Sequence, residues 1–174
     1  MHAYMKKVVT IVLIFLSLLG SVGCSSHINK QKFREIKTAA KALDLAVEDT
    51  TLSYEQFGGL LIKLNDEIAK TKAVVSTTEE KELLNFYEEL LTTYQDSSTL
   101  WEYKIGSFQY AWIPKGRIYV DAKIRTLVEK YHFPTESHVV ELTNHHWESI
   151  SADSIRVIWE KAHEQLKKIG GPLW

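Results

Sequence analysis

Hydrophobic positions over most of the chain recur at steps of three and four residues, which is the spacing of one face of an α-helix. From about Lys30 to Glu48 this apolar stripe is flanked by Lys, Arg and Glu, as in an amphipathic helix. A second helix is predicted after Ser53 and Gln56, which have the spacing of a capping box. The two stripes consist of Phe33, Ile36, Ala40, Leu43 and Val47, and of Phe57, Leu61, Leu64 and Ile68.

A longer stripe predicts a third helix from about Glu79 to Ser107, preceded by a second capping box of Thr77 and Glu80. Its apolar positions are Leu83, Tyr87, Leu90, Tyr94, Trp101 and Phe108. At 1.5 Å per residue such a helix is roughly 40 Å long. Because helix propensity alone does not stabilise a helix of this length, we expect the first two helices to cover it in an antiparallel bundle.

The pattern changes at Pro114-Lys115-Gly116, a clear break. Ile118 to Val120 is a candidate extended segment, and Asp121 is a good N-cap for a short helix. Asp153 or Ser151 caps a final helix, while residues 135–150 show no clear period and their structure stays open. The expected fold class is all-α: an antiparallel bundle of three long helices followed by two shorter C-terminal helices. A single helical domain would cover residues 32–170, with the long-helix bundle at 32–112 and the shorter helices at 116–170.

The N-terminal segment has the organisation of a signal peptide. Lys6 and Lys7 precede a mostly apolar run from Val8 to Val22, and small residues follow it up to Cys24. The run is shorter than the roughly 20 apolar residues that a transmembrane helix needs. An uncleaved membrane helix is the alternative interpretation, and either Met1 or Met5 can be the start.

Val22-Gly23-Cys24 resembles the lipobox of bacterial lipoproteins, although Ser21 stands where that family prefers leucine. The resemblance implies cleavage after Gly23, so that 1–23 is the signal peptide and 24–31 is a lipidated tether. It also implies acyl chains, such as palmitate, on Cys24, and two or more chains give stable membrane anchoring. By the sorting rule of that family, the resemblance also implies that Ser25, rather than Asp, after the cysteine favours an outer membrane, facing the periplasm, in an organism with two membranes. The predicted architecture is similar to that of uncharacterised all-helical periplasmic lipoproteins.

Charge and composition exclude several functions. The net charge is −1, and it is −3 from Cys24 onward because Lys6 and Lys7 are the only charged residues before it. A chain with this charge lacks the basic footprint of a nucleic-acid-binding protein and gains little from anionic lipid. The single cysteine excludes an internal disulfide framework.

The chain also contains no phosphate loop, dinucleotide glycine fingerprint or nucleophile elbow. We therefore expect a non-catalytic interaction or scaffold module rather than an enzyme. Its partners would be the membrane, through the lipid on Cys24, and an envelope protein, and it would need no other cofactor. The alternative is a helical bundle that binds a small molecule or a metal ion.

Two groups of residues raise the possibility of a metal site. If residues 138–148 were helical, their acidic and imidazole side chains would share one face and could bind Zn²⁺; these are His138, Glu141, His145 and Glu148. No His-Glu-x-x-His signature accompanies them, so a polar surface loop is the simpler interpretation. Glu129/His132 and Glu160/His163 have the spacing found in di-iron bundles, but both glutamates turn away from the apolar stripes of their helices. We expect no metal at either group.

Aromatic residues are dense between Trp101 and Tyr119. Trp101 and Phe108 lie on the predicted stripe, whereas Tyr103, Tyr110 and Trp112 do not. Aromatic side chains often form protein interfaces, although more often they fill a core. Trp112, just before the break, is therefore our first candidate for an exposed contact residue, followed by Tyr110 and Tyr103.

The lipid assignment leads to a direct prediction. Cys24→Ala removes the only thiol, so the variant should be released from membranes or accumulate with its leader uncleaved. Fractionation, with mass measurement of the N-terminal peptide of the native protein, tests this. An unacylated native Cys24 peptide still joined to the leader would refute the assignment.

Overall fold

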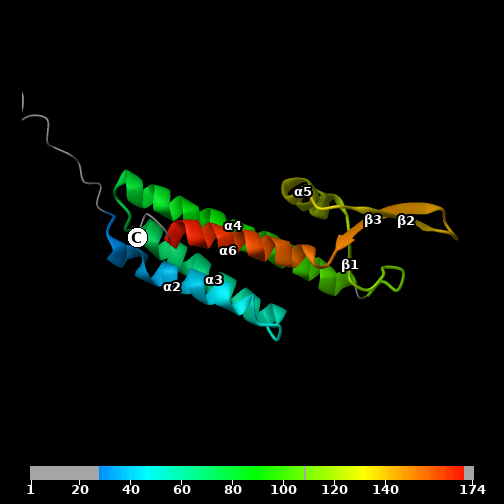
Figure 1. The fold of residues 1–174 in the computed structure, drawn as a ribbon, viewed down its shortest axis with the longest axis horizontal. Helices are drawn as coiled ribbons and strands as arrows, with labels where there is room; N and C mark the ends of the chain where they lie inside the picture. Colours follow the sequence, from blue (N-terminus) through cyan, green and yellow to red (C-terminus); the bar gives the residue numbers. More distant parts are fainter. Residues whose placement is uncertain (1–27, 108, 171–174) are drawn as a thin grey trace, which may run out of the picture.

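The computed structural model describes residues 28–107 and 109–170, and these form six helical elements and three strands (Figure 1). A short 3₁₀ helix, η1, covers Lys30–Phe33. The α-helices are α2 Arg34–Ala46, α3 Tyr54–Lys72, α4 Thr78–Ser107, α5 Ala122–Tyr131 and α6 Ser154–Gly170. The strands are β1 Arg117–Tyr119, β2 Glu136–Val140 and β3 His145–Ser151.

Four of these helices, α2, α3, α4 and α6, make the bundle (Figure 1). The helix α4 has 30 residues, or about 45 Å at 1.5 Å per residue, and packs against both α3 and α6. The helix α2 packs against α3 and α6, which places it diagonally across the bundle from α4. The expectation of three long helices with two short ones appended is therefore wrong. The periodicity of α6 identified its apolar face but not the helices that the face contacts.

The expectation of an all-α fold is also wrong, because the chain contains a three-stranded antiparallel sheet of order β1-β3-β2. The candidate extended segment at Ile118 is confirmed as β1, while residues 135–150 form the hairpin of β2 and β3. Asn144, in the turn of this hairpin, has a φ of 49°, a conformation that asparagine tolerates better than most residues. The strands β2 and β3 are short and largely polar, so their alternation is a weak signal beside the helical stripes.

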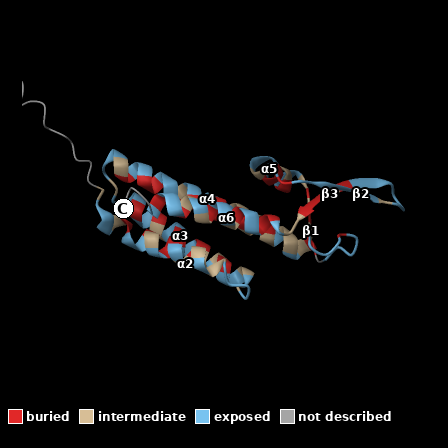
Figure 2. Ribbon diagram, viewed as in Figure 1, coloured by how far each residue is buried: buried red, intermediate tan, exposed pale blue. Residues whose placement is uncertain are grey.

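Two apolar clusters fill the interior (Figure 2). The first lies within the bundle and includes Phe33, Phe57 and Tyr87, which are fully buried. The second lies between the sheet, α5 and the far ends of α4 and α6, and includes Leu100, Ile118, Ile124, Ile150 and Ile158. Trp101 and Trp159 contact both clusters, and their ring centroids are 5.4 Å apart. The indoles thus join the packing of the bundle to that of the sheet.

The two predicted capping boxes both form. Ser53 accepts a hydrogen bond from the Gln56 backbone N–H at 3.1 Å, and the Gln56 side chain accepts one from the Ser53 N–H at 2.9 Å. Thr77 Oγ1 accepts from the Glu80 N–H at 3.2 Å, and Glu80 accepts in return from the Thr77 N–H at 3.5 Å. The second box matters more for the packing of the bundle, because its glutamate, Glu80, is only 1% exposed.

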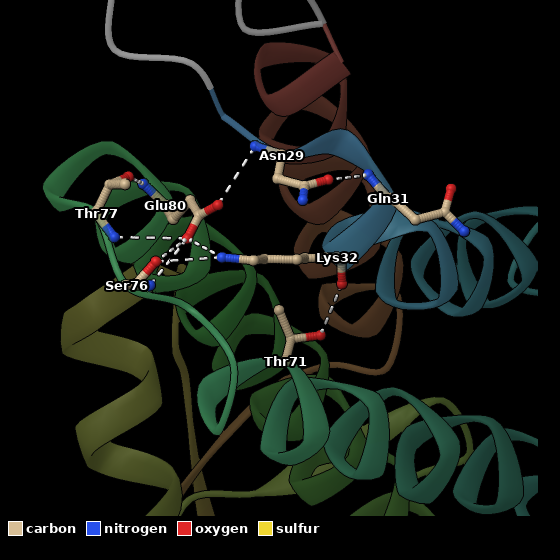
Figure 3. Close-up of polar contacts among 7 residues, drawn as sticks. All are labelled: Asn29, Gln31, Lys32, Thr71, Ser76, Thr77 and Glu80. Atoms are coloured by element: carbon tan, nitrogen blue, oxygen red, sulfur yellow. Dashed lines mark hydrogen bonds and ion pairs between the residues drawn. The ribbon is translucent and has the colours of Figure 1, made fainter. Parts of the chain in front are cut away.

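The Glu80 carboxylate connects three segments of the chain (Figure 3). It forms an ion pair with Lys32 Nζ at 2.7 Å, and it accepts hydrogen bonds from the backbone N–H groups of Ser76 at 2.9 Å and Asn29 at 3.3 Å. The Lys32 ammonium and these N–H groups stabilise the ionised form, which lowers the pKa of Glu80 to about 2. The start of the described chain is thereby tied to the turn between α3 and α4.

This depressed pKa predicts a dependence of stability on pH. The unfolded chain binds a proton at Glu80 near pH 4.5, whereas the folded chain does so only near pH 2, so the stabilisation from Glu80 is complete above about pH 5 and is lost as the pH falls toward 2. Glu80→Gln should lower the free energy of unfolding by about 3 kcal/mol at pH 7, because it leaves Lys32 without its counter-charge. Urea unfolding measured from pH 7 to pH 3 tests both statements.

The matched control is Glu79→Gln, which removes a neighbouring charge in the same helical turn. It should change the free energy of unfolding by less than about 0.5 kcal/mol. Equal effects of the two substitutions, or a Glu80→Gln variant with the full acid sensitivity of the parent, would contradict the assignment.

Candidate functional site

Four aromatic side chains gather on one face of the sheet, and we call Tyr110, Trp112, Tyr119 and Trp147 the aromatic surface. The ring of Trp112 is at its centre, with centroids 4.9 Å from Trp147, 5.7 Å from Tyr119 and 5.8 Å from Tyr110. Trp147 is only 7% exposed, whereas Trp112 is 44% and Tyr110 is 53% exposed. The buried ring of Trp147 and the half-buried ring of Tyr119 therefore support the exposed ones.

Strand alternation explains this arrangement. Successive side chains of a strand point to opposite faces, so Ile118 and Ile150, which are paired in the register, enter the second apolar cluster. Tyr119 and Trp147 point to the other face, where the segment between α4 and β1 places Trp112 against them. His138, paired with Trp147 across β2 and β3, stacks on its ring with centroids 4.0 Å apart.

The hairpin extends this region away from the body of the molecule (Figure 1). Leu142, in its turn, is 98% exposed and Val139 is 49% exposed. The hairpin and the aromatic surface lie beyond the C-terminal end of α4, whereas Asn29 is held beside the first turn of α4. The hairpin thus carries exposed apolar side chains in addition to those of the aromatic surface, and exposed apolar surface of this kind is a feature of interaction sites.

Of the three residues predicted as contacts, the structure brings Tyr110 and Trp112 together and separates Tyr103 from them. The Tyr103 hydroxyl donates to Asp121 Oδ2 at 2.6 Å, and Asp121 Oδ1 accepts the Ile124 N–H at 2.9 Å as the N-cap of α5. The hydrogen bond to this carboxylate raises the pKa of Tyr103 to about 12. Tyr103 thus positions α5, and the exposed contact candidates are Tyr110 and Trp112.

The helical face that would have grouped four metal-ligand candidates does not exist, because those residues lie on a hairpin. His138 contacts Ser149 Oγ at 2.8 Å through Nε2, and Glu148 is on the opposite face of the sheet, where it pairs with Arg125. Glu141 and His145 are exposed where the turn joins the strands. Within residues 28–107 and 109–170, no three His, Cys, Asp or Glu side chains are grouped so that they could hold a metal ion.

The two Glu-x-x-His pairs form no metal-binding group within the described residues either. His132 ends α5 in the left-handed conformation, with a φ of 55°, and Glu129 is exposed. His163 Nδ1 lies 3.0 Å from both carboxylate oxygens of Asp44, across the contact between α2 and α6.

Asp44 Oδ1 also accepts a hydrogen bond from the buried Tyr94 hydroxyl at 3.3 Å. Burial and the Asp44 charge raise the pKa of Tyr94. Asp44 and His163 line an open groove that also exposes parts of Trp101 and Trp159. Sequence reasoning missed this group, because Asp44 and His163 are 119 positions apart and no local spacing connects them.

Cys24 and Gly23 lie outside the described residues. Among the helices that the structure describes, none combines the length and apolar character needed to cross a membrane. Comparison with known proteins gives no family model, no curated protein and no solved structure that matches the chain.

The different roles of the two tyrosines can be measured. Tyr103→Phe removes the hydroxyl that supports the N-cap of α5 and should lower the free energy of unfolding by about 1.5 kcal/mol, since its acceptor is a carboxylate. Tyr110→Phe removes the same atom from an exposed ring and should cost less than about 0.5 kcal/mol. Chemical denaturation of both variants tests this, and indistinguishable midpoints would show that the Tyr103 hydrogen bond contributes nothing.

Proposed function

We propose that this protein is a lipid-anchored protein of the bacterial cell envelope that acts as a non-catalytic interaction module. Cys24 would carry the lipid, and the aromatic surface with the hairpin turn would contact an envelope protein partner. The lipobox-like sequence at Val22-Gly23-Cys24 supports the anchor. The proposal for the contact surface is supported by the arrangement of the described residues.

The observation that carries the proposal is the separation of the tether from the aromatic surface. Glu80 holds Asn29 beside the first turn of α4, and Trp112 follows the last turn of that helix. The two points therefore lie at opposite ends of an element about 45 Å long. A membrane-bound protein built in this way keeps its exposed aromatic rings away from the point of attachment. Tethering also raises the effective concentration of such a surface near partners in the same envelope.

The chemistry of the aromatic surface suits a protein partner. Trp and Tyr dominate the energetic centres of protein interfaces, because they bury a large area and lose little rotamer freedom. Here the exposed ring of Trp112 is already fixed against Trp147 and Tyr119, so less conformational entropy is lost on binding. Leu142 adds a fully exposed apolar side chain on the same hairpin that carries Trp147.

The groove at Asp44 and His163 favours a second candidate function, the binding of a small molecule. It combines partly exposed indole rings with an imidazole and a carboxylate, a mixture typical of ligand sites. Its open form, and the pairing of Asp44 with both His163 and Tyr94, make it the weaker candidate. The histidine and the carboxylate already satisfy each other.

Site-specific photo-crosslinking in intact cells tests the interaction function. A photoreactive residue at Leu142, which is 98% exposed, should capture a discrete protein. Trp112→Ala in the same chain should reduce the crosslinked product several-fold, because it removes the central ring of the aromatic surface.

The matched control is the same photoreactive residue at Ile62, which is 64% exposed on α3, a helix that packs mainly against α2 and α4. It should not give the same product. Monomer alone from position 142, or identical products from positions 62 and 142, would overturn the proposal.

A further inference from the structure

Charge is distributed unevenly along the chain, although the net value is close to zero. Residues 28–41 contain five basic residues and one acidic residue, whereas residues 42–174 contain 14 basic and 21 acidic residues. The positive charge is therefore concentrated in η1 and the first two turns of α2. A net charge taken over the whole domain conceals this segregation.

Four of these basic residues lie along one side of η1 and α2, and we call Lys30, Arg34, Lys37 and Lys41 the basic stripe. They follow one another at steps of four, three and four residues, which places them on a common helical face. Phe33, Ile36 and Ala40, on the adjoining faces of the same helices, are fully buried in the bundle, whereas Lys30, Arg34 and Lys41 are exposed and Lys37 is half-buried, so the basic stripe faces outward. Together with Gln31 and Thr38, the four basic residues line a shallow hollow with no acidic residue in its wall.

The electrostatics of the basic stripe favour an anionic occupant. Burial lowers the pKa of Lys37, and repulsion from Lys41 and Lys30 lowers it further. An anion placed among these ammonium groups would relieve that repulsion. The carboxylate of Glu35 pairs with Arg34 at 2.9 Å, but both side chains are exposed, so this pair contributes little and is screened by salt.

The position of the basic stripe identifies the anion. Lys30 follows Cys24 by six residues, which span at most about 20 Å when extended. We propose that the basic stripe binds the phosphate headgroups of anionic lipids in the membrane that holds the anchor. Clusters of four or more basic residues beside an anchor are attracted to anionic membrane surfaces in this way. The location of the membrane beside the basic stripe rests on the proposed lipid anchor.

This contact gives the bundle an orientation. With the basic stripe on the bilayer, α2 lies along the surface, and α4, diagonal to it, lies on the side away from the membrane. The sheet packs on α4 through β1, so the aromatic surface stays on the exposed side. A lipid anchor alone would leave the domain free to turn about its attachment, and the second contact removes that freedom.

Vesicle binding of the full chain carrying Cys24→Ala tests the proposal without a lipid anchor. The probes are vesicles of phosphatidylcholine alone and vesicles that also contain phosphatidylglycerol. Binding to the anionic vesicles should be at least about tenfold tighter, and high salt should abolish the preference. Changing Lys30, Arg34, Lys37 and Lys41 together to Gln should also abolish it, with helical content unchanged by circular dichroism.

The matched control changes four exposed lysines outside the basic stripe to Gln, namely Lys63, Lys81, Lys115 and Lys168. It alters the net charge equally and keeps the N-terminal segment, so it should retain most of the preference. Equal binding to both kinds of vesicle, or equal losses in the two variants, would overturn the proposal. Full competition by millimolar inorganic phosphate would assign the hollow to free phosphate instead. None of these results changes the expected crosslinking at Leu142, so the two proposals fail separately.

Discussion

The arrangement of the helices depends on one buried carboxylate. Glu80 is almost inaccessible to water, and a buried charge is tolerated only when its partners replace the lost hydration. Here those partners come from two distant segments, Asn29 and Lys32 on one side and the turn at Ser76 on the other. Satisfying the carboxylate therefore fixes where η1 enters the bundle. The start of α2, and with it the outward direction of the basic stripe, follows from that position.

The same helix that begins at this carboxylate ends beside the sheet, so α4 relates the two regions that we assign to function. Trp101 and Trp159 join the apolar cluster of the bundle to that of the sheet, and the Trp159 Nε1–H donates to the buried Ser97 Oγ at 2.9 Å. This junction makes the sheet a continuation of the packed interior. The aromatic surface is consequently held in a definite position relative to Asn29 and η1, as the proposed membrane-bound interaction module would require.

The sequence predicted the parts of this fold that depend on local chemistry. The apolar stripes located α2, α3, α4 and α6 to within a few residues, and both capping boxes formed where Ser53 and Thr77 indicated. The stripes could not show that α6 completes a four-helix bundle, because periodicity shows which face of a helix is apolar but not which other helix packs against that face. The hairpin was missed because β2 and β3 are short and carry polar residues such as His138 and Glu148, whose spacing also matches a helix. In the candidate site, Trp112 was identified from its position off the stripe. Its support by Trp147, and the pairing of Asp44 with His163, depend on contacts between residues far apart in the chain.

The bonds between Glu80 and the residues of η1 have a mechanical consequence. If the lipid on Cys24 fixes the chain to a membrane, a force on the domain reaches the bundle first at Asn29 and Lys32. There it is resisted by the ion pair and the backbone hydrogen bond to a single carboxylate, and by the bond from Thr71 Oγ1 to the Lys32 carbonyl. These bonds connect η1 and its N-cap to two helices at once. A pulling force would therefore be shared between α3 and α4 before η1 could separate from the bundle. Tension on the anchor would thus enter the molecule at this group of bonds.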